Sequence, residues 1–170
     1  ADKEEIGSEG NAGMQSIVYF DIIADLAKTL GASDIVVRAN SKCLSSDVNA
    51  AFDPNFPEVN ERRNACFVNN GVVLTKYTGA RGKSGSNDAS AEFTGWVRNM
   101  LDKAGVIWQT SELGKVDQGG GGTVAKYIAK MNVDVIDLGV PVISMHAPYE
   151  VVSKTDVYMT HKAIEAFFKA

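Results

Sequence analysis

The sequence predicts an α/β protein, built as a three-layer α/β/α sandwich with helices on both faces of a sheet. Segments with helical periodicity alternate with short apolar runs, which is the pattern of strands buried between two layers of helices. A length of 170 residues fits one domain with a substantial core. The content of 45% hydrophobic and 22% charged residues is typical of a globular protein.

The first half of the chain contains a predicted helix, a predicted strand and a long connection. In residues 15–30 the apolar side chains follow helical spacing and Gly31 comes directly after them; they are Tyr19, Ile22, Ile23, Leu26, Ala27 and Leu30. Residues 34–40 (DIVVRAN) form a β-branched run, which predicts a buried strand. Residues 49–70 contain two prolines and predict an irregular connection.

The second half alternates more regularly. Residues 72–77 predict a strand, and residues 89–105 predict a helix that Asp88 or Ser86 can cap and Gly105 ends. A strand-like stretch at 106–109 precedes a glycine loop, KVDQGGGGT, and a short helix at 124–131. Two strands follow, at 133–138 and 141–145. Ser153 and Asp156 form a candidate capping pair for a last helix that ends at Lys169.

Composition excludes several classes of function. The net charge of -4 and the pI near 5.2 argue against a general nucleic-acid-binding protein. No apolar run reaches the roughly 18 residues of a membrane span, and no secretory signal is visible. Cys43 and Cys66 form no CxxC pair. Two cysteines in a chain of this size predict free thiols and a reducing, cytoplasmic environment.

Four side chains are candidates for a hydrolytic zinc site. Such a site needs carboxylate and imidazole ligands at strand ends, and a further carboxylate that takes a proton from water. Glu4 and Glu5 are adjacent in a loop, Asp47 follows a strand-like stretch, and His146 follows an apolar strand. Neighbouring side chains in an extended loop point in different directions, so one glutamate can face the metal and the other the water. Taken singly, each also fits a plain surface, turn or buried role.

Three segments in order, DKEEIGSEG, SSDVNAAFDPN and DLGVPVISMHAPYE, resemble the aspartyl aminopeptidase and aminopeptidase I family of two-zinc exopeptidases. The resemblance implies a zinc-exopeptidase-like catalytic domain with a mixed sheet, which removes N-terminal residues, acidic ones among them, from peptides. It implies two Zn²⁺ ions, with Co²⁺ or Mn²⁺ able to serve. It also implies a large homo-oligomer, such as a dodecamer.

The same resemblance assigns roles to the candidates. Glu4 is similar to the general base, Glu5 and His146 to ligands of one zinc, and Asp47 to a ligand of the other. The family's remaining histidine and bridging aspartate, and an inserted assembly domain, lie upstream of the Glu-Glu pair. We therefore expect residues 1–170 to be the C-terminal portion of a single catalytic domain. The N-terminal portion and the assembly domain would be absent, and this portion alone would bind zinc weakly and be inactive.

Other interpretations remain open. Gly82, Lys83 and Ser84 match the end of the phosphate-loop motif G-x-x-x-x-G-K-[ST], but Tyr77 occupies the position of its first glycine. The glycine loop at 115–123 is either a tight turn or a wall of a substrate pocket in which Asp117 meets a free amino terminus.

Substrate recognition and the absence of catalysis are two further interpretations. A peptidase could use Lys76, Arg81 or Lys83 to attract an acidic side chain of its substrate. A non-catalytic structural or interaction domain on the same fold is the alternative to an enzyme. His161 is expected to serve packing, and Trp96 and Trp108 are expected to be core or interface residues.

Overall fold

The computed structural model describes residues 8–79, 81, 84–115 and 117–170. Its larger sheet has the strand order β1-β5-β3-β4. The strands are β1 (Lys42–Ser45), β5 (Asp134–Gly139), β3 (Val72–Thr75) and β4 (Trp108–Thr110). β1 pairs with β5 in parallel, β5 with β3 in antiparallel, and β3 with β4 in parallel, so the sheet is mixed.

A second, smaller sheet continues from two strands of the first. β2 (Asn49–Ala50) follows β1 and β6 (Pro141–Ile143) follows β5, and these two pair in parallel. The Asn49 N–H donates to the carbonyl of Val140. This bond links the β1–β5 pair to the β2–β6 pair, at the place where both segments pass from one sheet to the other. β7 (Val151–Val152) pairs with β6 in antiparallel.

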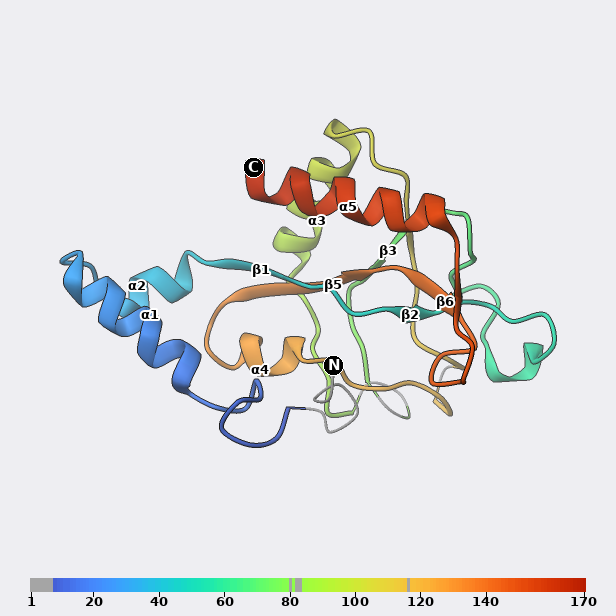
Figure 1. Cartoon of the computed structure of the whole chain (residues 1–170), viewed down its shortest axis with the longest axis horizontal. Coiled ribbons are helices and arrows are strands. Elements are labelled where there is room, and N and C mark those ends of the chain that lie inside the picture. The colour runs from blue at the N-terminus through green and yellow to red at the C-terminus, as the bar shows by residue number, and fades with distance from the viewer. Residues whose placement is uncertain (1–7, 80, 82–83, 116) are drawn as a thin grey trace.

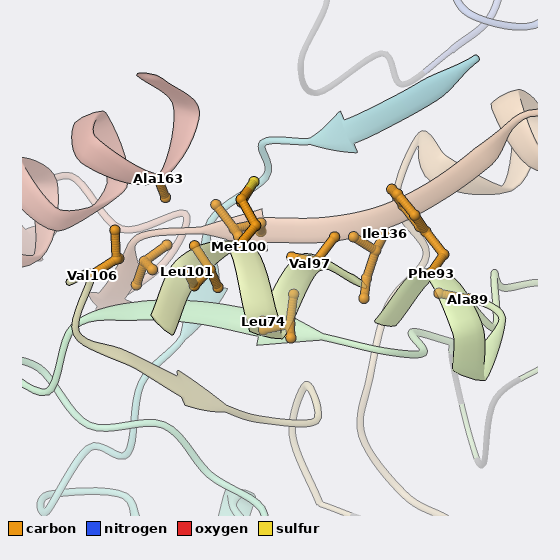
Figure 2. Packing of buried hydrophobic residues seen from close by; sticks show 11 residues of the cluster. Leu74, Ala89, Phe93, Val97, Met100, Leu101, Val106, Ile136 and Ala163 are labelled. Atoms are coloured by element: carbon orange, nitrogen blue, oxygen red, sulfur yellow. The ribbon is translucent and has the colours of Figure 1, made fainter. Parts of the chain in front are cut away.

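Two helices cover one face of the larger sheet. α3 (Ala91–Lys103) and α5 (Lys154–Lys169) pack against each other and against β3 and β5 (Figure 1). The largest hydrophobic cluster lies between them and the sheet. Figure 2 shows Phe93, Val97, Met100 and Leu101 of α3 facing Leu74 and Ile136 of the strands. Burial of these side chains is the main stabilising contribution on this face.

The other face is covered by α4 (Ala125–Ala129) and by one side of α1 (Val18–Thr29). Because side chains alternate along a strand, Ile136 faces α3 while Val135 faces this second cluster. The cluster joins Phe20 of α1, Ala125 and Ile128 of α4, and Val135. Helices therefore lie on both faces of the sheet, and the predicted three-layer α/β/α architecture is confirmed (Figure 1).

Two predicted capping arrangements are wrong in detail. Ser90 caps α3, because its Oγ accepts a hydrogen bond from the Phe93 N–H, and neither Asp88 nor Ser86 is the N-cap. Gly105 does end this helix, with a positive φ of 62°. Ser153 is the N-cap residue of α5 without a side-chain capping bond, and Asp156 binds another loop instead.

The prediction of a strand at 34–40 is also wrong. Asp34–Ala39 is a short helix, α2, and the strand, β1, begins only at Lys42. Asp34 lies in the first turn and Arg38 in the last, joined by an ion pair of 3.0 Å. This i,i+4 pair and the favourable placement of its charges relative to the helix dipole support a helix despite the β-branched side chains. The connection 49–70 contains β2 and a 3₁₀ turn, Pro57–Val59.

The apolar stripe of α1 does not face the core as its spacing predicts. Ile22 and Leu26 are 54% and 59% exposed, and Leu30 is 82% exposed. Only Phe20 and Ala27 of this helix are buried. α1 packs on α2, and the two project together from the side of the sheet (Figure 1).

The final helix does not turn His161 inward as expected. Asp156, Thr160 and Ala163 are its buried residues, whereas His161 is exposed and does not serve packing. Both tryptophans pack against the largest cluster as expected. Among the described residues, none of the helices is long and apolar enough to cross a membrane.

Candidate active site

A large open cavity of about 1130 Å³ lies beside the point where β1 and β5 pass into the smaller sheet. Four segments line it: the β1–β2 junction, the 53–60 segment, the glycine loop and the turn after β6. Pockets for small ligands typically measure about 300–1,000 Å³. This cavity is therefore large enough to take the end of a peptide chain.

Asp47 reaches the cavity from the junction between β1 and β2. One of its carboxylate oxygens, Oδ1, accepts the N–H of Val48 at 2.9 Å. Its backbone carbonyl packs directly on Gly139, at the end of β5. The carboxylate is therefore held at one oxygen and by its own main chain, which restricts the direction in which the other oxygen points.

His146 reaches the same cavity from the turn after β6. Its φ of 65° is in the left-handed region, which a residue other than glycine rarely adopts. Its backbone N–H donates to Glu150 Oε1 at 2.6 Å, so Glu150 stabilises this unusual turn. Glu150 also lines the cavity, a role that the sequence analysis missed. The sequence HAPYE places this acid four residues after the histidine, and that spacing was the signal from which the role of Glu150 could have been predicted.

The donor types fit zinc, although the described residues do not complete a site. Asp47 and His146 offer oxygen and nitrogen, which are zinc ligands in proteins. Within residues 8–79, 81, 84–115 and 117–170, no three histidine, cysteine, aspartate or glutamate side chains lie close enough to hold a metal ion. The other predicted ligand, Glu5, and the predicted base, Glu4, lie outside the described residues.

The glycine loop forms one wall of the cavity. Gly120, Gly121, Gly122 and Thr123 line it, whereas the predicted amine-binding Asp117 is not among the lining residues. Gly120 has a φ of +105°, and a Cβ there would lie 1.9 Å from the carbonyl oxygen of Gly79. Only glycine fits such an approach.

Asp137 is a functional candidate that the sequence analysis missed. It lies in β5 and is 4% exposed, and its Oδ2 accepts the Thr123 hydroxyl at 2.9 Å. Burial raises the pKa of Asp137 to about 6; the Ser45 and Thr123 hydroxyls oppose the rise and the Asp47 charge adds to it. The signal in the sequence was an acid in the middle of an apolar strand, VDVIDLG.

The two cysteines are free thiols, as predicted. Cys66 is fully buried and Cys43 partly so. Burial raises the pKa of the Cys43 thiol, and raises that of Cys66 to about 11. Both thiols therefore remain protonated at neutral pH, which makes them poor nucleophiles.

The loop between β3 and α3 gives little support to a phosphate site. Gly82 and Lys83 of the motif lie outside the described residues. Lys76 pairs with Asp88, so its charge is already partly neutralised. Arg81 is exposed, and its backbone N–H donates to the carbonyl of Gly119 in the glycine loop.

A family model described as aminopeptidase I zinc metalloprotease (M18) matches residues 1–168. The chain belongs to the M18 aminopeptidase I family. A probable M18 family aminopeptidase 1 from Clostridium acetobutylicum is 51% identical over 170 residues, which cover 98% of this chain and 37% of that protein. A probable M18 family aminopeptidase 1 from Thermotoga maritima is 46% identical, and this chain covers 38% of that protein.

Solved structures of M18 enzymes match the fold closely. The crystal structure of aminopeptidase I from C. acetobutylicum has a TM-score of 0.90 at 48% identity, over 97% of this chain and 36% of that one. The M18 aminopeptidase of T. maritima has a TM-score of 0.91 at 46% identity, over 96% of this chain and 38% of that one. The predicted family and the α/β fold are confirmed. The chain spans little more than a third of the length of these relatives.

Proposed function

We propose that the protein containing this chain is a zinc aminopeptidase that hydrolyses the first peptide bond of peptides. The observation that carries the proposal is the meeting of Asp47 and His146, far apart in sequence, at one cavity of an M18 chain. Family membership supports zinc as the metal. Relatives that share 51% and 46% of the sequence bear the name aminopeptidase.

The roles follow the chemistry of each side chain. Glu5, Asp47 and His146 would hold zinc, Asp47 on one ion and the other two on the second. Two zinc ions, when bound, would polarise the scissile carbonyl and lower the pKa of the attacking water. Glu4 would take a proton from that water and return it to the leaving amine. Glu150 would keep the turn of His146 in place through its bond to the His146 N–H.

The test uses the full-length protein and a panel of aminoacyl substrates, with acidic residues included. Turnover should require zinc and disappear on chelation. Glu4→Gln should retain zinc while losing most turnover, about 10²-fold or more. His146→Ala and Glu5→Ala should lose zinc as well as turnover. His161→Ala is the matched control, since His161 is exposed on α5, and it should change neither quantity.

Two outcomes would contradict this assignment. Equal loss of zinc in Glu4→Gln and His146→Ala would refute the division between base and ligand. A full-length protein without zinc or turnover would favour a non-catalytic interaction domain on an M18 fold.

The remaining features of the full-length protein belong to the same proposal. It would be cytoplasmic, because both thiols are free, and would bind two ions per site, with Co²⁺ or Mn²⁺ as substitutes. It would form a homo-oligomer, such as a dodecamer. A yeast relative whose structure is described as a dodecamer shares the fold, with a TM-score of 0.75 at 24% identity. Residues 1–170 would be the C-terminal portion of one catalytic domain, inactive without the rest.

A further inference from the structure

We propose that Asp137 is a positioning residue, which anchors the glycine loop through Thr123 and thereby sets the wall of the cavity against which the peptide substrate lies. The proposal rests on the proposed peptidase function for the identity of the ligand. The anchoring itself rests on geometry alone. Neither Asp137 nor Thr123 was a candidate from the sequence.

The first step is the position of Asp137 in the sheet. It lies in the central strand β5, opposite Ser45 of β1 and Thr75 of β3 in register. A buried carboxylate is costly unless polar groups bond to it. Among the described residues, Asp137 Oδ1 has no hydrogen-bond partner, so the carboxylate depends on the bond that its Oδ2 accepts. β5 is buried from Val135 to Gly139, so this carboxylate has a rigid support.

The second step is the bond from this support to the loop. The Thr123 hydroxyl donates to Asp137 Oδ2 at 2.9 Å. Thr123 directly follows Gly119–Gly122, which have no side chains with which to hold themselves in place. A hydrogen bond to a charged acceptor is stronger than one between neutral groups. The bond therefore fixes the end of the loop that leads into α4.

The third step is the other end of the glycine run Gly119–Gly122 within this loop. The Arg81 N–H donates to the Gly119 carbonyl at 2.9 Å, and Gly120 packs against the Gly79 carbonyl. With both ends held, the cavity-lining glycines between them have a defined path. Removing the Thr123 anchor would release one end and leave the other attached.

The fourth step connects the loop to the predicted metal ligand. Asp47, Thr123 and Asp137 together line a small cavity, which shares Asp47 and Thr123 with the large one. Asp137 is two residues before Gly139, on which the Asp47 main chain packs. One strand therefore positions both the loop wall and the Asp47 junction. The space between the loop wall and the Asp47 junction is where the end of a peptide would fit.

The decisive variant is Thr123→Val in the full-length zinc enzyme, because valine keeps the shape and removes the hydroxyl. Loss of the hydrogen bond should raise KM for peptide substrates about fivefold to tenfold, with kcat and zinc content nearly unchanged. Hydrogen exchange of the peptide covering residues 114–124, measured by mass spectrometry, should accelerate about tenfold.

Three further variants separate positioning from general stability. Thr123→Ser keeps the hydroxyl and should restore both KM and slow exchange. Thr160→Val removes another buried threonine hydroxyl, which donates to the Asp156 carbonyl within α5, and should change neither quantity. Thr123→Val combined with Asp137→Val should accelerate loop exchange no further than Thr123→Val alone, because the bond is already broken.

Several results would overturn the proposal. Unchanged loop exchange in Thr123→Val would refute the anchoring, whether or not the protein is a peptidase. Faster exchange with unchanged KM would refute the effect on substrate, and loss of zinc in Thr123→Val would show a wider structural role. A wild type that binds zinc but hydrolyses no peptide would refute the proposed function, and with it the substrate part of this inference.

Discussion

The carbonyl oxygen of Asp47 lies 1.5 Å from the point where a Cβ on Gly139 would stand. Any side chain at position 139 must therefore displace the main chain of Asp47, since backbone cannot move aside as a flexible side chain can. This contact presses the β1–β2 junction against the end of β5. The orientation of Asp47, the predicted zinc ligand, therefore depends on the absence of a Cβ atom at position 139.

Gly139→Ala should consequently damage both stability and metal binding. We expect a loss of about 3 kcal/mol in the free energy of unfolding, the upper range for overpacking in a rigid region. If the proposed function holds, zinc content and turnover of the full-length protein should fall together. Urea titration and metal analysis measure the two effects.

Gly95→Ala is the matched control for this substitution. Gly95 lies inside α3 with no atom within 4 Å of the added Cβ. Alanine there should increase stability by about 0.5–1 kcal/mol, because glycine is unfavourable inside a helix. Equal effects of the two alanines would contradict the steric role of Gly139.

Asp156 should be a major structural carboxylate. It is 1% exposed at the start of α5, and its two oxygens accept the backbone N–H groups of Asn69 at 2.6 Å and Gly71 at 2.8 Å. Asp156→Ala should cost about 2–5 kcal/mol, because it leaves two donors without this acceptor. Asp156→Asn keeps one acceptor oxygen and should cost less.

The control for Asp156 is Thr155, which makes a hydrogen bond to the same loop but at the surface. The Thr155 hydroxyl donates to Asn69 Oδ1 at 2.6 Å in an exposed position. Thr155→Ala should cost no more than about 1 kcal/mol. Urea unfolding curves that place Thr155→Ala and Asp156→Ala at the same midpoint would refute the distinction.

Cys66 should make stability fall at alkaline pH. Burial raises the pKa of its thiol from 9.0 to about 11. Between these values the unfolded chain loses the proton while the folded chain keeps it, so folding becomes less favourable as pH rises. The difference of roughly 2 pH units corresponds to about 3 kcal/mol, fully present below pH 9 and lost by pH 11.

The measurement is the free energy of unfolding at several pH values from 8 to 11, for the wild type and for Cys66→Ala. Subtracting the two curves removes the contribution of the lysines and tyrosines, which titrate in the same range. The wild type should lose about 3 kcal/mol more than the variant. Parallel curves would show that Cys66 does not titrate in this way.

The exposed stripe of α1 should tolerate charge. Leu26 is 59% exposed, so Leu26→Lys should change the stability of the chain by no more than about 0.5 kcal/mol. Phe20→Ala on the same helix should cost about 3 kcal/mol, because Phe20 is buried against α4 and β5. Thermal unfolding of the 170-residue chain measures both, and a large loss in Leu26→Lys would contradict the exposure of this face.

The sequence by itself determined the family, the layered fold and several elements. The strands around Val72–Thr75 and Asp134–Gly139 and the helices around Ala91–Lys103 and Lys154–Lys169 carry strong local signals, namely apolar runs, periodicity and stop residues. Local signals suffice where neighbouring residues agree on one structure. They also placed Asp47 and His146 at strand ends, which explains why both reach one cavity.

Only the tertiary structure decided the elements whose local signals conflict. The β-branched run of Asp34–Ala39 predicts a strand, whereas its charges at i and i+4 support a helix, and the folded chain has the helix. Which face of α1 is covered depends on what packs beside it, so periodicity alone identified an apolar stripe and not its burial.

The role of Asp137 also came from the tertiary structure alone. Thr123 and Asp137 are fourteen residues apart, and no spacing rule joins a loop threonine to a strand carboxylate. Their bond exists because the fold brings the end of the glycine loop beside β5, just as it brings the β1–β2 junction against Gly139. Contacts between distant segments depend on how the layers stack, and the stacking is a property of the whole chain.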